Sequence, residues 1–171
     1  MNVISLYFAL WVTVDHDGQD ILYSTALSLS MLAVALSVPV FGALSDTTRK
    51  RRVPLIGLTL LCIFSTGMIG TTNHLWTGLI LFMVANYGYQ SALVFYNGML
   101  PSISRGSHVG LVSGYGVALG YLGSILGMVL VKPFVESGGR SAAFLPTAGL
   151  LLLFSLPCFL FVKDHNTRSA P

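Results

Sequence analysis

The sequence contains very little charge. Asp, Glu, Lys and Arg make up only 9% of its 171 residues, whereas a typical soluble domain has about 25%. Hydrophobic residues make up 54%, and the mean hydropathy is +0.77. A water-soluble globular protein is therefore not expected, and the composition is that of a membrane protein.

Groups for metal, redox or hydrolytic chemistry are also scarce. The two cysteines, Cys62 and Cys158, lie inside apolar runs, and their spacing fits neither a metal site nor a redox pair, so we expect buried, unlinked thiols. No cluster of histidines, carboxylates and an activated nucleophile is present. No basic tract is long enough to suggest a nucleic-acid partner. The sequence predicts no catalytic residue, no metal, no cofactor and no enzyme activity.

Long apolar runs separate the few charged clusters. About 20 apolar residues in a helix cross a hydrocarbon core of about 30 Å. The sequence thus predicts an all-α membrane protein in the lipid bilayer, with membrane-spanning helices over about 21–45, 53–71, 75–100, 109–131 and 142–162. Residues 3–14 form a sixth apolar run that is too short to cross. No Lys or Arg precedes it and no cleavage site follows it, so we favour the outer part of a first helix over a signal peptide, and expect the chain to be a fragment.

The distribution of basic residues predicts the orientation. If the connecting segments alternate between the two sides, seven of the nine Lys and Arg residues fall on one side, which marks that side as cytoplasmic. The loops near 15–20, 72–74 and 132–141 then face outward, and 163–171 forms a cytoplasmic tail.

The run over 75–100 is the most polar of the five. At 100° per residue, Asn86, Gln90 and Asn97 fall within about 60° of one another, so three amides share one stripe. Such a stripe avoids lipid either by forming hydrogen bonds between helices or by lining a polar cavity. Both interpretations remain open, and the candidate cavity residues are Asn86, Gln90, Asn97, Tyr89 and Tyr121. The runs 53–71 and 142–162 are almost uniformly apolar, and we expect them to be peripheral.

The run over 109–131 is rich in glycine. Small residues four positions apart let a second helix approach closely. The sequence therefore predicts close helix packing at Gly110, Gly114, Gly116, Gly120, Gly123 and Gly127.

The segment 42–52 joins the second and third helices. It resembles the signature of the major facilitator superfamily at this point, a Gly-x-x-x-Asp followed by a basic turn, and Gly42, Asp46, Lys50 and Arg51 match that signature. Thr47 stands where a basic residue is usual, and Arg49 where a glycine is usual.

Longer strings extend the resemblance over nearly the whole chain. Residues 23–30, 85–90, 94–101 and 112–123 resemble the vacuole-effluxer-type transporters of that superfamily. This resemblance implies the six-helix amino-terminal half of a secondary transporter, with a missing carboxy-terminal half as its partner. It also implies two inverted three-helix repeats, 1–71 and 75–162, with the first and fourth helices lining a central cavity and the third and sixth facing lipid.

The resemblance further implies alternating-access transport of a small polar solute, with amino acids as the candidate class, in a bacterial plasma membrane or a eukaryotic vacuolar membrane. None of the complete spans contains an ionisable residue of the kind that proton coupling uses. Either the coupling groups lie elsewhere or the carrier is a uniporter. The alternative to a transporter is a truncated, transport-inactive or purely structural membrane protein.

Overall fold

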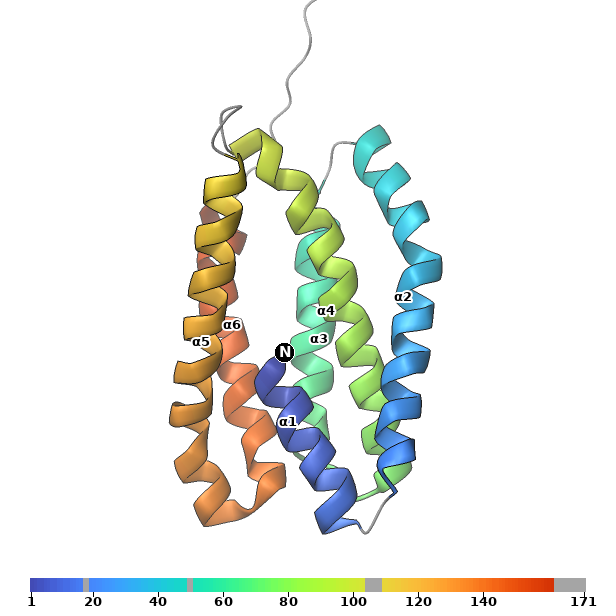
Figure 1. Cartoon of the computed structure of the whole chain (residues 1–171), viewed down its shortest axis with the longest axis vertical. Helices are drawn as coiled ribbons and strands as arrows, with labels where there is room; N and C mark the ends of the chain where they lie inside the picture. The colour runs from blue at the N-terminus through green and yellow to red at the C-terminus, as the bar shows by residue number, and fades with distance from the viewer. Residues whose placement is uncertain (17–18, 49–50, 104–108, 162–171) are drawn as a thin grey trace, which may run out of the picture.

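A computed structural model describes residues 1–16, 19–48, 51–103 and 109–161, and this part of the chain is helical with no strand. The α-helices stand side by side in one bundle (Figure 1): α1 (Asn2–Leu10), α2 (Asp20–Thr48), α3 (Arg52–Ile69), α4 (Leu75–Ile103), α5 (Val109–Gly138) and α6 (Phe144–Phe161). A π-helical turn, η1 (Trp11–Asp15), continues α1, and a 3-10 turn, η3 (Arg140–Ala143), precedes α6. The predicted all-α class is confirmed.

Five helical segments within the described residues are long and apolar enough to cross a membrane. They cover Asp20–Ser45, Arg52–Ile69, Leu75–Met99, Gly110–Gly138 and Arg140–Leu160, and a shorter apolar helix covers Asn2–Asp15. These segments match the five predicted spans and the predicted short run. The chain is thus a multi-pass membrane protein.

The end of α5 differs from the prediction. The segment 132–138, expected as part of an outer loop, continues the helix despite Pro133. A proline removes one backbone N–H, but the segment beyond it stays helical and carries two local side-chain contacts. Lys132 pairs with Glu136 at 3.6 Å, and the Ser137 hydroxyl donates to the Pro133 carbonyl at 3.0 Å. The chain turns only at Gly139, whose φ of 77° lies in the region that glycine favours.

The successive long helices alternate in direction. The ends of α2, α4 and α6 lie at the top of Figure 1 with the start of α3, whereas the α3–α4 turn and η3 lie at the bottom. α4 is the most buried of the five long segments and packs against both α2 and α3, whereas α5 is the least buried. By the predicted orientation, the top is the cytoplasmic side and the bottom the outer side.

An aromatic core fills the outer half of the bundle. Phe8 of α1 stacks on Phe82 of α4 with ring centroids 4.4 Å apart, and Trp11 lies 5.6 Å from Phe8. All three side chains are buried. Gly78 makes this packing possible, because a Cβ at this position would lie 2.6 Å from the Trp11 ring. The first helix is therefore fixed to α4 by aromatic contacts.

A second glycine brings α3 and α4 together. A Cβ at Gly88 would lie 2.8 Å from the Leu58 carbonyl oxygen and 3.2 Å from the Cys62 backbone nitrogen. These distances are shorter than ordinary van der Waals contact, so only glycine allows this backbone approach. With α3 packed this closely on one face, α4 presents a different face to α2.

Candidate functional site

Two amides of the α4 stripe, Asn86 and Gln90, face α2, and Asn86 forms a hydrogen bond there. Asn86 is 1% exposed, and its Nδ2 donates a 2.8 Å hydrogen bond to the Oγ of Ser30, which is itself buried. The Ser30 hydroxyl in turn donates to the Leu27 carbonyl at 2.8 Å. Asn86 thus lies in an interhelical hydrogen bond, the first of the two arrangements expected for the stripe.

Further polar contacts follow along the same α2–α4 seam toward the inner end. The Tyr87 hydroxyl donates to the Ser37 Oγ at 3.0 Å. Gln90 lies one turn beyond Asn86, is half-buried, and contacts the Met31 thioether at 3.7 Å through Nε2. A thioether is a weak acceptor. Gln90 therefore keeps most of its hydrogen-bonding capacity for another ligand.

The other candidate cavity residues lie apart from this seam. Asn97 is exposed near the inner end of α4, next to Tyr96, which is 40% exposed. Tyr89 points away from α2 and lines an apolar cavity of about 260 Å³ between α3, α4 and α6, together with Cys62 and Phe154. Tyr121 is 64% exposed on α5. The structure therefore brings Asn86 and Gln90 together and leaves Tyr89 and Tyr121 elsewhere.

Most of the α5 glycines face open space within the described chain. A Cβ at Gly110, Gly114, Gly120 or Gly123 would meet nothing within 4 Å. Close neighbours appear at the other two of the six predicted packing positions. A Cβ at Gly116 would lie 3.5 Å from the Tyr96 hydroxyl, and one at Gly127 would lie 3.4 Å from a Val3 methyl group. Near the latter contact, Asn2 donates a long 3.4 Å hydrogen bond to Ser124 and links α1 to α5.

Two consecutive arginines join three helices at the inner end of the bundle. The Arg51 Nε donates to the Ser45 Oγ on α2 at 2.8 Å, and its Nη1 donates to the Gly98 carbonyl on α4. Arg52 donates through Nη2 to the Phe159 carbonyl on α6. Within the predicted loop motif, Arg51 is thus a bridge between α2 and α4.

The rest of the motif is described only in part. A Cβ at Gly42 would meet nothing within 4 Å. Asp46 lies in the last turns of α2, but its side chain falls outside the description, as does the whole of Lys50.

Helix polarity explains why a basic segment is stable at this position. Arginines at the start of α3 face the positive end of their own helix dipole, which is unfavourable. However, α4 and α6 end nearby, and the negative ends of their dipoles attract cations. Phe159 lies in the last turn of α6, where carbonyl groups lack partners within the helix, so Arg52 supplies one.

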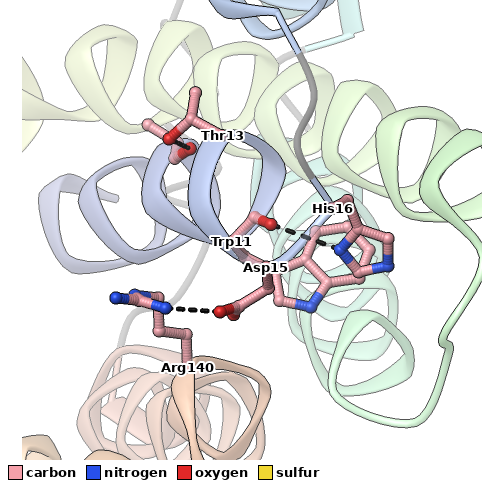
Figure 2. Close-up of polar contacts among 6 residues, drawn as sticks. Trp11, Thr13, Asp15, His16 and Arg140 are labelled. Carbon is pink, nitrogen blue, oxygen red and sulfur yellow. Dashed lines mark hydrogen bonds and ion pairs between the residues drawn. The ribbon is translucent and has the colours of Figure 1, made fainter.

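A polar cluster closes the outer end of the first helix. Arg140 of η3 forms an ion pair with Asp15 at the end of η1, and both side chains are about one-third exposed (33% and 32%). His16 follows directly, and its ring contacts the Trp11 ring at an interplanar angle of 54°, with ring centroids 4.1 Å apart (Figure 2). Sequence reasoning missed this cluster. The sequence did contain a signal for it, because Asp15 and Arg140 carry opposite charges and lie in two loops that were both predicted to face outward.

Clustered metal ligands are not found in the described part of the chain, where no three His, Cys, Asp or Glu residues come together. Cys62 is buried and Cys158 is half-buried, and neither forms a disulfide. The chemistry that this structure offers is therefore hydrogen bonding by amides and hydroxyls, chiefly along the α2–α4 seam.

Comparison with known proteins agrees with this architecture. The family model of the Major Facilitator Superfamily matches residues 1–171. The chain belongs to the Major Facilitator Superfamily. An uncharacterized protein of Aquifex aeolicus is 31% identical over 166 residues, which cover 95% of this chain and 41% of that protein. An uncharacterized MFS-type transporter of Bacillus subtilis, YxiO, is 24% identical over 152 residues, which cover 81% of this chain and 36% of that transporter.

This member of the superfamily thus spans about two-fifths of the length of these curated relatives. No solved structure matches the chain. Family membership is confirmed, whereas the printed descriptions of these two relatives name no solute.

Proposed function

We propose that this superfamily member acts as part of a secondary transporter that moves a small polar solute, with amino acids as the class to test first. Both the superfamily match and the multi-pass helical bundle support transport. The solute class is supported by the chemistry of the α2–α4 seam and by the resemblance of segments 23–30, 85–90, 94–101 and 112–123 to vacuole-effluxer-type transporters. Two bacterial relatives favour a bacterial plasma membrane as its location.

The half-buried amide of Gln90 is the observation that carries the proposal. An amide both donates and accepts hydrogen bonds, so it can pair with the carboxylate or the ammonium group of an amino acid. Gln90 has only a weak thioether contact among the described residues, whereas Asn86 is buried and paired with Ser30. We therefore assign solute contact to Gln90, with Asn97 as a second contact nearer the inner end, and a packing role to Asn86.

Uptake by the complete reading frame in liposomes tests this assignment. The panel would contain radiolabelled neutral, acidic and basic amino acids, and the variants would be Gln90→Leu and Asn86→Ala at matched reconstitution. We expect Gln90→Leu to lose uptake of the transported solute while its melting temperature is kept. We expect Asn86→Ala to lower the melting temperature while uptake per folded protein is kept.

Two outcomes would contradict different parts of the proposal. Unchanged uptake in Gln90→Leu would remove Gln90 from the solute site. Absence of uptake for every amino acid, in a folded wild-type protein, would reject this solute class. If sugars and peptides were not moved either, the alternative of an inactive or structural membrane protein would be favoured.

A further inference from the structure

The side chain of His16 lies between two backbone carbonyl groups at the outer end of the first helix. Its Nδ1 is 3.3 Å from the Trp11 carbonyl oxygen, and its Nε2 is 3.0 Å from the Asn73 carbonyl oxygen. Trp11 belongs to η1, whereas Asn73 lies in the turn between α3 and α4. His16 therefore spans two segments that are 57 residues apart in the sequence.

The chemistry of these two contacts depends on a proton. A carbonyl oxygen only accepts hydrogen bonds, and a neutral imidazole carries a single N–H. The neutral ring can thus donate to one of the two carbonyls, while the lone pair on its other nitrogen faces the second oxygen. The protonated ring carries two N–H groups and donates to both. Binding of a proton completes the link between η1 and Asn73.

His16 also has an aromatic neighbour. The Trp11 ring lies 4.1 Å from the His16 ring, within the range in which an indole attracts a positive charge. Trp11 is held rigidly, because it is 3% exposed and packs against Gly78. The ring that receives the proton therefore has a fixed partner.

Several charged or titratable residues lie on the segments around His16, and Asp17 follows it directly in the sequence. Asp15 precedes His16 and pairs with Arg140 of η3, so these two charges offset each other. Asp20 begins α2, and His74 follows Asn73 in the turn, whereas α4 carries no charged residue.

From this geometry we propose that His16 is a proton-binding site. The ligand is a proton from the outer compartment, and its binding fastens the outer end of the first helix to the α3–α4 turn. This inference goes beyond the proposed solute transport, because it concerns a different ligand at the opposite side of the membrane from the basic loop. It holds whichever solute is moved.

Trp11 fluorescence provides a direct test. The complete protein carrying Trp76→Phe, and Phe at any tryptophan outside this chain, keeps Trp11 as its one indole. A protonated imidazole in contact with an indole quenches its emission. In lipid nanodiscs titrated between pH 8 and 5, we expect a single-step loss of Trp11 emission. The step should vanish in His16→Gln and persist in the matched control His74→Gln.

The result that overturns the proposal is a Trp11 emission that stays constant across this range, or a step that persists in His16→Gln. If His16→Gln does not fold, NMR of the histidine ring 15N resonances in the Trp76→Phe protein replaces the fluorescence comparison. The resonances missing from His74→Gln and from the other histidine variants identify His16 by difference. If the His16 ring carries two protonated nitrogens at pH 5 and one at pH 8, the proposed proton-binding site is supported. If it carries one protonated nitrogen at both pH values, the proposal is rejected.

Discussion

Asn86 and Ser30 are joined by a 2.8 Å hydrogen bond between helices, although 56 residues separate them in the sequence. Both side chains are almost fully buried, at 1% and 2% exposed. An unpaired amide at this depth would cost several kcal/mol in hydrocarbon. The hydrogen bond therefore favours the rotation of α4 that turns Asn86 toward α2. Once Asn86 faces Ser30, Gln90 follows one turn later on the same seam.

Asn86→Leu should destabilise the protein more than Gln90→Leu does. The first change removes the Asn86–Ser30 hydrogen bond, worth about 0.6 kcal/mol on average in membrane proteins, and adds a poorly shaped side chain to a buried position. The second removes only a thioether contact. Thermal unfolding in detergent measures both effects, and an equal loss of stability would contradict the different roles given to the two amides.

Gly88→Ala should loosen the contact between α3 and α4. The new methyl group would lie 2.8 Å from the Leu58 carbonyl oxygen, and relieving such overpacking costs about 1–3 kcal/mol. Gly57→Ala is the matched control on α3, because a Cβ there meets nothing within 4 Å and alanine favours a helix by up to about 1 kcal/mol. Chemical unfolding should separate the two variants clearly. A stable Gly88→Ala protein would show that the helices do not approach so closely.

Asp15→Asn and Arg140→Gln should show a coupling energy in a double-mutant cycle. The pair is about one-third exposed, so we expect roughly 0.5–1 kcal/mol, reduced by added salt. Lys132 and Glu136 form the comparison pair. Their side chains are 71% and 65% exposed, and their coupling should be at most about 0.5 kcal/mol. Additive effects of the Asp15 and Arg140 changes would mean that the ion pair contributes nothing.

Arg51→Lys should weaken the inner end of the bundle although the charge is kept. The guanidinium reaches Ser45 and Gly98 in two directions, whereas an ammonium group is a single point charge on a flexible stem. We expect a loss of about 1 kcal/mol in unfolding free energy, the scale of a single hydrogen bond. A melting temperature equal to that of the wild type would show that the positive charge alone, and not the two-directional guanidinium contacts, stabilises this end of the bundle.

Labelling of single cysteines tests the orientation. In a background with Cys62→Ala and Cys158→Ala, Asn73→Cys should react with a membrane-impermeant maleimide added to intact cells, because the α3–α4 turn is predicted to face outward. Thr47→Cys, at the exposed inner end of α2, should react only after the cells are opened. The reverse pattern would invert the topology.

Much of the fold could be predicted because the signals are local. Charge-free runs of sufficient length specified the helices, and their boundaries agree to within a few residues except at the end of α5. There the predicted span ended at residue 131 because charged residues follow, whereas the helix continues through Lys132 and Glu136 to Gly138. The absence of charge marks the apolar part of a helix, but it does not mark where the helix itself ends.

The site was harder to predict because it depends on helix rotation and pairing. Periodicity placed Asn86 and Gln90 on one stripe, but only the position of Ser30 shows that the first is satisfied and the second is not. Tyr89 is near Asn86 and Gln90 in the sequence, but its side chain lines the apolar cavity between α3, α4 and α6. The roles of Gly110, Gly114, Gly120 and Gly123 stay predictions, because nothing in the described chain packs against them.

The contact between Arg52 and the Phe159 carbonyl joins residues 107 positions apart. During synthesis, α3 leaves the ribosome long before α6 exists, so this contact forms only after α6 has been made. Until then the basic segment has its positive charge, which retains it on its side of the bilayer, and the contacts of Arg51 with α2 and α4. Translation of α6 then supplies the carbonyl group that the arginine binds, so a nascent chain that has not yet reached α6 would be inserted without this contact.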